Sequence, residues 1–363
     1  MTGPALTRRG FLGAAAVSVT AAARVVAEPP RRLGIPLGFD NFAVRALDWD
    51  ADRLVEHAVA LGCDAVFITD FGPFRDRTDD AALADLRARS ADRGVAILLG
   101  SWSVCPTAKR FKHDWGTAEE HLARGIRMAK ALGSPAFRVI LGDSSDRLSE
   151  GGIAARIADT VAVLKQCRPL ARDAGVKIAV ENHAGDMTSR ELLALVEQAG
   201  PDVVGVNFDS GNACWALEDP VAALDRLAPH VLTTSLRDTM AWESPRGVTT
   251  QWTAMGEGCT DLPAFFGLFA KRCPGVTANI ETISGFAREL PLLERDFWKG
   301  YPDVRGEDVA GLVALARKGR AIEPFKAPEG ADRRQAEREY QLAELARSVA
   351  HCRNALGLGL RGS

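Results

Sequence analysis

The chain has 363 residues, 47% of them hydrophobic, which is enough apolar material for one large domain or two ordinary ones. Lysine and arginine number 45 against 47 aspartate and glutamate, so the formal net charge is −2 at pH 7. This balance lacks the basic excess of a nucleic-acid-binding surface, and we expect no nucleic-acid partner. No apolar run approaches the ~20 residues that a membrane-spanning helix needs, so we expect no integral membrane protein.

The N-terminal segment has the pattern of an export signal. Residues 7–12 contain paired arginines and a Phe-Leu step, and an apolar stretch follows over residues 13–23. This arrangement resembles a twin-arginine signal peptide, here assigned to residues 1–27 with cleavage after Ala27 or, alternatively, near Ala23. The mature protein is then expected in the periplasm or outside the cell. A merely basic N-terminus without a targeting role is the alternative.

Seven cysteines occur along the chain, and no two of them form a Cys-x-x-Cys pair. That spacing disfavours a zinc knuckle or a redox motif, and it assigns no disulfide pairing. We expect most of these cysteines to act as small buried apolar residues. They are Cys63, Cys105, Cys167, Cys214, Cys259, Cys273 and Cys352.

From residue 33 onward, short apolar runs alternate with longer helical patterns, which indicates parallel strands joined by helices. Eight strands are expected, at residues 33–39, 65–69, 95–100, 136–141, 177–180, 204–208, 231–236 and 276–280. Eight units in series predict a closed (β/α)8 TIM barrel, a single α/β domain over residues 33–320. An open doubly wound sheet is disfavoured because no Gly-x-Gly-x-x-Gly follows the first strand.

A C-terminal extension follows the barrel. Residues 286–318 are expected to hold the eighth helix and an insertion, and residues 321–363 a linker and a charged helix over 332–350. The simplest interpretation packs this last helix on the outside of the barrel. A role in forming a homo-oligomer is left open.

Carboxylates end three of the predicted strands. Glu181 follows strand five, Asp209 follows strand six and Glu281 follows strand eight. In this fold the active site lies at the C-terminal ends of the strands, so the three side chains should meet there. Like charges brought together need a cation, and a divalent metal is the simplest one. The alternative for a lone carboxylate is an ion pair, with Arg138 or Arg237 as the candidate partner.

Several short strings around these residues carry a family resemblance. They are Val-Glu-Asn-His at 180–183, Phe-Asp-Ser-Gly-Asn at 208–212, Ser-Leu-Arg-Asp at 235–238, Met-Gly-Glu-Gly at 255–258 and Asn-Ile-Glu at 279–281. In this order the strings resemble the sugar phosphate isomerase/epimerase family, whose fold is the xylose isomerase-like TIM barrel. The resemblance covers roughly residues 33–290.

The resemblance implies a divalent metal: Mn²⁺, Mg²⁺, Co²⁺ or Zn²⁺. The family usually holds it with Glu, Asp, His and Glu, and the matching positions here are Glu181, Asp209, Ser235 and Glu281. Ser235 is a departure, because a neutral hydroxyl is a poor ligand beside an imidazole. Three consequences stay open: a water fills the place, His183 or Asp238 moves in, or the metal has been lost.

The resemblance also implies a chemistry, proton transfer next to a carbonyl, with Glu181 and Glu281 as the acid/base pair. The residues expected to bind substrate are His183, Asn212, Arg237 and Trp102, with Phe39 and Trp252 as further apolar wall. The family often has histidine where Asn212 stands, which is a second departure. The predicted function is a metal-dependent isomerase or epimerase acting on a sugar or keto-sugar.

Three alternatives accompany this prediction. Related barrels cleave oxidised glycosides by the same carbon-acid step, so a lyase fits equally. A sugar-binding protein that has lost catalysis would explain Ser235 and Asn212. A metal-dependent phosphodiesterase or endonuclease is disfavoured because the chain has only six histidines and such sites gather several. Export favours a free sugar derivative over a sugar phosphate, since phosphorylated metabolites stay inside the cell.

Overall fold

The computed structural model describes Met1, residues 32–283 and residues 287–361. Apart from Met1, the predicted export signal therefore lies outside the described residues.

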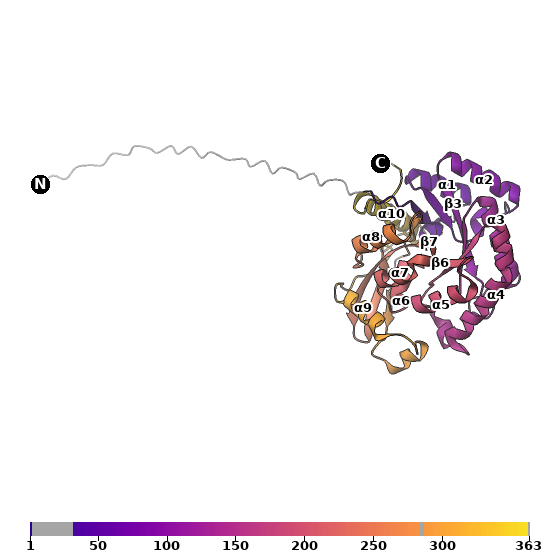
Figure 1. The fold of residues 1–363 in the computed structure, drawn as a ribbon. Coiled ribbons are helices and arrows are strands. Elements are labelled where there is room, and N and C mark those ends of the chain that lie inside the picture. Colours follow the sequence, from indigo (N-terminus) through magenta and orange to yellow (C-terminus); the bar gives the residue numbers. More distant parts are fainter. Residues whose placement is uncertain (2–31, 284–286, 362–363) are drawn as a thin grey trace.

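Eight parallel strands form the centre of the structure (Figure 1), as the sequence predicts. They are β1 (Leu37–Asp40), β2 (Ala65–Ile68), β3 (Ala96–Ser103), β4 (Ala136–Ile140), β5 (Lys177–Glu181), β6 (Val204–Asp209), β7 (Val231–Ser235) and β10 (Ala278–Ile280). The strand order runs from β10 through β1 to β7, and a parallel bridge from Leu236 to Ile280 joins the two ends. The sheet is thus closed into a barrel.

Helices surround this barrel and connect its strands (Figure 1). They are α1 (Ala51–Ala60), α2 (Asp80–Asp92), α3 (Ala118–Leu132), α4 (Gly152–Ala174), α5 (Ser189–Ala199), α6 (Ser210–Trp215), α7 (Pro220–Leu227), α8 (Leu262–Arg272), α9 (Gly306–Ala316) and α10 (Arg333–Asn354). Short 3₁₀ helices are η1 (Asn41–Leu47), η2 (Gly72–Phe74), η3 (Ser144–Leu148), η4 (Ala228–His230) and η5 (Arg295–Gly300). None of the helices within the described ranges has both the length and the apolar composition that a bilayer crossing needs.

The last helix occupies the eighth position of the outer ring. Helix α10 contacts β1, β10 and η1, and it buries Leu345, Val349 and Cys352 in the main core. The sequence pattern predicts the eighth helix within residues 286–318, but α9 packs instead against strands of a second sheet. The C-terminal helix is therefore an integral part of the barrel wall.

A three-stranded antiparallel sheet, which the sequence pattern does not predict, lies beside the barrel mouth. Its strands are β8 (Asp238–Ser244), β9 (Gly247–Thr253) and β11 (Ala287–Leu290), in the order β11-β9-β8. Together with α9 it forms a second apolar cluster that includes Val248, Leu290 and Leu312. Strands β8 and β9 follow β7 in the chain and β11 follows β10, so the sheet places residues 238–253 next to the barrel mouth.

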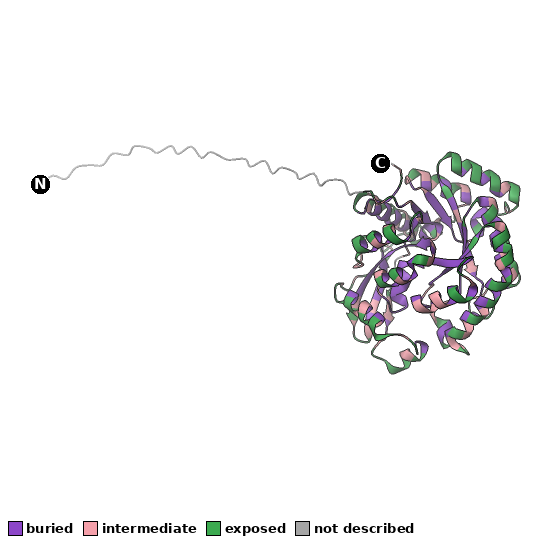
Figure 2. Ribbon diagram, viewed as in Figure 1, coloured by how far each residue is buried: buried purple, intermediate pink, exposed green. Residues whose placement is uncertain are grey.

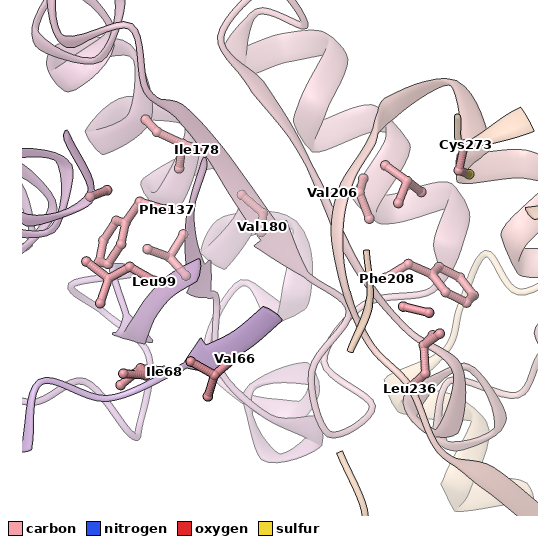
Figure 3. Packing of buried hydrophobic residues seen from close by; sticks show 14 of the residues in the cluster. Val66, Ile68, Leu99, Phe137, Ile178, Val180, Val206, Phe208, Leu236 and Cys273 are labelled. Atoms are coloured by element: carbon pink, nitrogen blue, oxygen red, sulfur yellow. The ribbon is translucent and has the colours of Figure 1, made fainter. Parts of the chain in front are cut away.

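Strand residues alternate between the barrel interior and the helix layer, because successive side chains of a strand point to opposite faces. Apolar residues facing the helices form the main core, and they include Phe137, Ile178, Val180 and Phe208 (Figure 3). Exposed residues gather on the outer faces of the helices (Figure 2). The alternate residues of the same strands, Glu181 among them, are left to face the interior.

Helix α3 shows how local chemistry fixes the two ends of a helix. The Thr117 hydroxyl accepts a hydrogen bond from the backbone N–H of Glu120, and the Glu120 carboxylate accepts one from the backbone N–H of Thr117. This reciprocal pair fixes the start of α3. Gly133 ends the same helix with φ of 74°, a left-handed conformation that glycine adopts without strain.

All seven cysteines are free, and all but the half-buried Cys259 are buried, which confirms their expected apolar role.

We predict that packing of α3 on β4 tolerates no added side chain at Gly125. A Cβ atom there would overlap the ring of Phe137, so Gly125→Ala should destabilise the protein by about 1–3 kcal/mol. At Gly267 in α8 an added Cβ meets no atom within 4 Å, and Gly267→Ala should stabilise it by about 0.5–1 kcal/mol. Urea unfolding of both variants measures the difference. Equal effects of the two substitutions would contradict this packing.

Candidate active site

Four acidic side chains project into the C-terminal mouth of the barrel. Asp40, Glu181 and Asp209 end β1, β5 and β6, and Glu281 directly follows β10. Their exposed fractions are 0%, 1%, 0% and 5% in chain order. Each occupies an inward position in its strand, one residue after an outward core residue such as Val180. The sequence predicted three of these carboxylates at the mouth and missed Asp40.

Arg237 joins two of the carboxylates. Its Nη2 atom donates both to Oδ2 of Asp209 and to Oε2 of Glu281, the latter at 2.5 Å. The guanidinium carbon lies 4.2 Å from the centre of the Trp252 ring, so the planar group rests on an aromatic face. Its Nε and Nη1 atoms are buried and have no hydrogen-bond partner among the described residues. Two donors of a fixed cation are therefore available to a bound molecule.

Glycine at position 211 makes room for this arginine. An ideal Cβ built on Gly211 would lie 2.6 Å from Cδ of Arg237 and 2.8 Å from Cδ1 of Trp252. The Asp-Ser-Gly-Asn string thus serves two purposes, because Asp209 binds the arginine and Gly211 lets its side chain pass. Ser210 also holds the arginine backbone, since its Oγ accepts a hydrogen bond from Arg237 N at 3.0 Å.

Glu181 is held by a different cation. Arg138, which points inward from β4, donates from Nε to Oε2 of Glu181 at 2.6 Å and from Nη1 to the Ser101 carbonyl at 2.7 Å. The amide of Asn207 donates to the same Oε2 at 2.6 Å. These contacts fix one oxygen of the carboxylate. The other oxygen, Oε1, has only a long contact of 3.4 Å from Nδ2 of Asn212.

A serine occupies the position where the family usually has histidine. Ser235 Oγ accepts a hydrogen bond from Asn207 Nδ2 at 3.2 Å and donates to Oδ2 of Asp40 at 3.4 Å. Asp40 also accepts a hydrogen bond from the Thr69 hydroxyl at 2.8 Å. The four acidic residues and two arginines thus form one buried polar network.

The environment separates the carboxyl groups by their proton affinity. Burial raises the pKa of Asp40, Asp209 and Glu281 above the usual carboxyl range, and neighbouring carboxylates add to that effect. Burial opposes ionisation of Glu181 as well, but the charge and hydrogen bond of Arg138 outweigh it and hold the Glu181 pKa below its usual range. Groups with different proton affinity within one site are the arrangement that general acid/base chemistry uses.

His183 and Trp102 form one wall of the site. His183 Nδ1 lies 2.6 Å from the Gly142 carbonyl, and burial lowers the pKa of the imidazole. A neutral ring in this orientation donates from Nδ1 and leaves Nε2 as an acceptor. The Trp102 ring meets it edge-on with centroids 5.8 Å apart, and Trp102 Nε1 donates to the Arg110 carbonyl at 2.9 Å.

A cavity of about 330 Å³ opens over this network. Its volume falls at the small end of the range for small-molecule sites. All four predicted substrate-binding residues, His183, Asn212, Arg237 and Trp102, line it, and so do both predicted catalytic residues, Glu181 and Glu281. Phe42, Trp215 and Trp252 supply apolar surface.

Two expected residues lie elsewhere. Phe39 was expected on the apolar wall, but it faces the helix layer, where its ring meets that of His57 edge-on at 5.6 Å, because it alternates with the inward Asp40. Asp238 does not move toward the other carboxylates. It accepts hydrogen bonds from the backbone of Gly256 at 3.2 Å and Gly258 at 2.9 Å, so it organises the Met-Gly-Glu-Gly loop.

A sequence profile described as "Xylose isomerase-like TIM barrel" matches residues 55–296. The chain belongs to this family.

Two curated proteins resemble the chain in sequence. The "3-oxo-isoapionate decarboxylase" of Pectobacterium atrosepticum is 23% identical over 213 residues, which span 58% of this chain and 70% of that protein. The "Uncharacterized protein YihM" of Escherichia coli is 29% identical over 107 residues, 30% of this chain and only 31% of YihM.

Solved structures share the fold of this family member. A D-psicose 3-epimerase solved in the presence of D-fructose superposes with a TM-score of 0.57 at 15% identity, over 89% of this chain and all of that one. The IOLI protein with a bound zinc atom gives a TM-score of 0.52 at 16% identity, over 79% of this chain and 100% of that one. Sugar epimerases and a zinc-binding protein are thus among the structural neighbours.

The family resemblance implies a metal, and the donor set of this chain does not fit one in the observed arrangement. Within the described residues, no group of three or more His, Cys, Asp or Glu side chains is arranged to hold a metal ion. The predicted ligands Glu181, Asp209 and Glu281 do come together. Their oxygens, however, form ion pairs with the side-chain nitrogens of Arg138 and Arg237. The alternative considered from the sequence, ion pairs with Arg138 and Arg237, is the arrangement that the structure has.

We predict that Glu181 depends on Arg138 for its burial. Arg138→Met leaves a buried carboxylate without its cation, which should cost about 3–5 kcal/mol of stability. Adding Glu181→Gln removes the uncompensated charge, so the double variant should be more stable than Arg138→Met alone. Chemical unfolding of the two variants measures this coupling.

An exposed ion pair provides the matched control. Arg347 Nε lies 2.8 Å from Glu257, and both side chains are about half exposed, at 47% and 48%. Arg347→Met should therefore cost less than about 1 kcal/mol. If Arg138→Met were equally mild, or if Glu181→Gln failed to recover stability, the buried pair would not be the structural element described above.

Proposed function

We propose that this protein is an enzyme that transfers a proton next to the carbonyl group of a small sugar or sugar-derived compound. One observation carries the proposal: buried carboxylates of different proton affinity, with fixed arginine donors among them, line a cavity of about 330 Å³. Membership of the xylose isomerase-like family and the sugar epimerases among its structural neighbours support the class of substrate.

Glu181 is the proposed base. Its lowered pKa keeps it ionised at neutral pH, and its Oε1 is the oxygen left free by Arg138 and Asn207. Glu281 is the proposed acid, since burial raises its pKa and favours the protonated form. A base and an acid that approach the substrate from different strands can remove a proton at one place and return it at another, which is isomerisation or epimerisation.

Arg237 supplies the proposed stabilisation of the intermediate. Removal of a proton beside a carbonyl places negative charge on the carbonyl oxygen, and fixed donors aimed at that oxygen lower the barrier. The Nε and Nη1 atoms of Arg237 have this character, being buried in the cavity wall without partners among the described residues. His183 and Asn212 then orient the hydroxyl groups of the substrate from the same cavity.

Decarboxylation of a sugar-derived keto acid is the second candidate. The relative in Pectobacterium atrosepticum is named "3-oxo-isoapionate decarboxylase", which favours decarboxylation over other reactions of the fold. Loss of CO₂ beside a ketone leaves the same charged oxygen that proton removal does, so Arg237 would serve both reactions. Cleavage of an oxidised glycoside begins with the same carbon-acid step and is tested alongside.

The test is exchange of solvent deuterium into a panel of ketoses, followed by NMR. Wild-type protein should label the carbon next to the carbonyl of one panel member. Glu181→Gln and Glu281→Gln should each slow labelling by about 100- to 10,000-fold, the usual contribution of a general acid or base. The exposed Glu257→Gln serves as the matched control and should retain full rate.

Other outcomes of the same assay separate the alternatives. Release of CO₂ from 3-oxo sugar acids without exchange into ketoses would support the decarboxylase. Loss of an aglycone from an oxidised glycoside would support the lyase. Sugar binding with none of these reactions would contradict the proposal and favour a non-catalytic binding protein.

We further propose that the protein is exported through its twin-arginine segment. Replacing Arg8 and Arg9 together by lysine should leave the chain unprocessed in the cytoplasm, whereas wild type should appear in the periplasmic fraction, shortened to begin near Glu28. The same change at Arg31 and Arg32, beyond the predicted cleavage point, should have no effect. Immunoblots of cell fractions measure this, and periplasmic accumulation of the first variant would refute the signal.

A further inference from the structure

We infer that Arg237 takes the place of the divalent metal in this member of the family, so that the site is complete with a cation built into the chain. The inference follows from the disagreement between the ligand positions that the family implies and the contacts that those positions make here. It concerns which cation the site uses, and it holds whichever reaction the site performs.

The first observation is the position of the guanidinium group. A metal in this family would lie between the carboxylates that end β6 and follow β10, and those are the two that Arg237 Nη2 bridges. Arg237 Nη2 and a metal ion cannot both lie between Asp209 and Glu281, because both are positively charged and both would bind the same carboxylate oxygens. The ion pairs are almost fully buried, with side-chain exposure of 2% for Arg237, 0% for Asp209 and 6% for Glu281.

The second observation is that the remaining negative charge is also accounted for. Glu181 has Arg138 at 2.6 Å, and Asp40 has hydrogen bonds from Thr69 and from the backbone of Phe42 at 2.9 Å. Crowded carboxylates require a cation because their mutual repulsion in a buried site is large. Two guanidinium groups supply cationic charge to these carboxylates from the chain itself, which weakens the electrostatic reason for recruiting a metal.

The third observation is the loss of the nitrogen ligand. Ser235 stands where the family has histidine, and its hydroxyl is engaged with Asn207 and Asp40. The histidine that lies nearby, His183, directs Nδ1 to the Gly142 carbonyl. Asp238 is committed to loop amides. Neither His183 nor Asp238 thus takes the place of the missing nitrogen ligand.

The fourth observation is that the arginine is built in rather than loosely placed. The Trp252 ring supports one face of the Arg237 guanidinium. The aliphatic part of the Arg237 side chain passes over Gly211, where any added side chain would collide with it. A planar cation that stacks on an aromatic ring and pairs with carboxylates is the type of group for which arginine, and not lysine, is suited. The serine that replaces the family's histidine at position 235 and the space that Gly211 leaves for Arg237 therefore both favour Arg237 as the cation of this site.

The experiment compares metal binding by the purified mature protein and by variants. Wild type should carry substoichiometric Mn, Zn, Co and Mg by elemental mass spectrometry, and titration with Mn²⁺ should give no one-to-one binding isotherm. Its melting temperature should not change with EDTA or with added Mn²⁺, since only a ligand that binds the folded state raises it. The double variant Ser235→His/Arg237→Met restores the nitrogen ligand and removes the bridge. It should bind one Mn²⁺ at least about tenfold more tightly than wild type, which is about 1.4 kcal/mol.

Each outcome decides the inference. One equivalent of tightly held metal in wild type, or a melting temperature that rises with Mn²⁺, would overturn it, and neither result requires any variant to fold. A folded double variant with no gain in Mn²⁺ affinity would also count against it. Arg347→Met is the control for removal of an arginine, and it should leave metal binding as in wild type. Because the readout is binding, a negative result here leaves the deuterium-exchange test of function intact.

Discussion

A carboxyl group that is closed off from water stays charged only where a cation lies beside it. In this barrel the cations are side chains of the chain itself: Arg237 between Asp209 and Glu281, and Arg138 against Glu181. This constraint determines much of what surrounds the site. It explains a glycine at position 211, an aromatic platform at Trp252 and an inward arginine in the middle of an otherwise apolar strand.

The site forms because of the way side chains alternate along the parallel strands of the barrel. Alternate residues of each strand face the helices and form the core, and the residues between them face inward. Every inward side chain at the end of a strand therefore approaches the same space, whatever its distance in sequence. The C-terminal helix α10 completes the wall over β1 and β10, so the strands that carry Asp40 and Glu281 depend on a segment far along the chain.

Much of this arrangement could be predicted from the sequence, for identifiable reasons. The barrel could be predicted because eight apolar runs alternate with helical patterns, and Glu181, Asp209 and Glu281 because each directly follows such a run. The same reasoning applied to Leu37–Asp40 would have found Asp40, since it too follows an apolar strand. The small antiparallel sheet was missed because β8 and β9 are polar strands whose partner, β11, lies beyond β10 in the sequence.

What the sequence could not decide was the identity of the cation. A metal ion and an arginine can each neutralise the same set of carboxylates, and the sequence strings around Glu181 and Asp209 are compatible with either cation. The choice depends on where the long, flexible side chain of Arg237 lies, which the spacing of residues does not specify.

A crystal structure of the protein grown with Mn²⁺, with data collected for anomalous scattering, tests the central claim most directly. The account predicts guanidinium density between Asp209 and Glu281 and no anomalous peak there. A manganese peak on Glu181, Asp209 and Glu281, with Arg237 displaced, would contradict it.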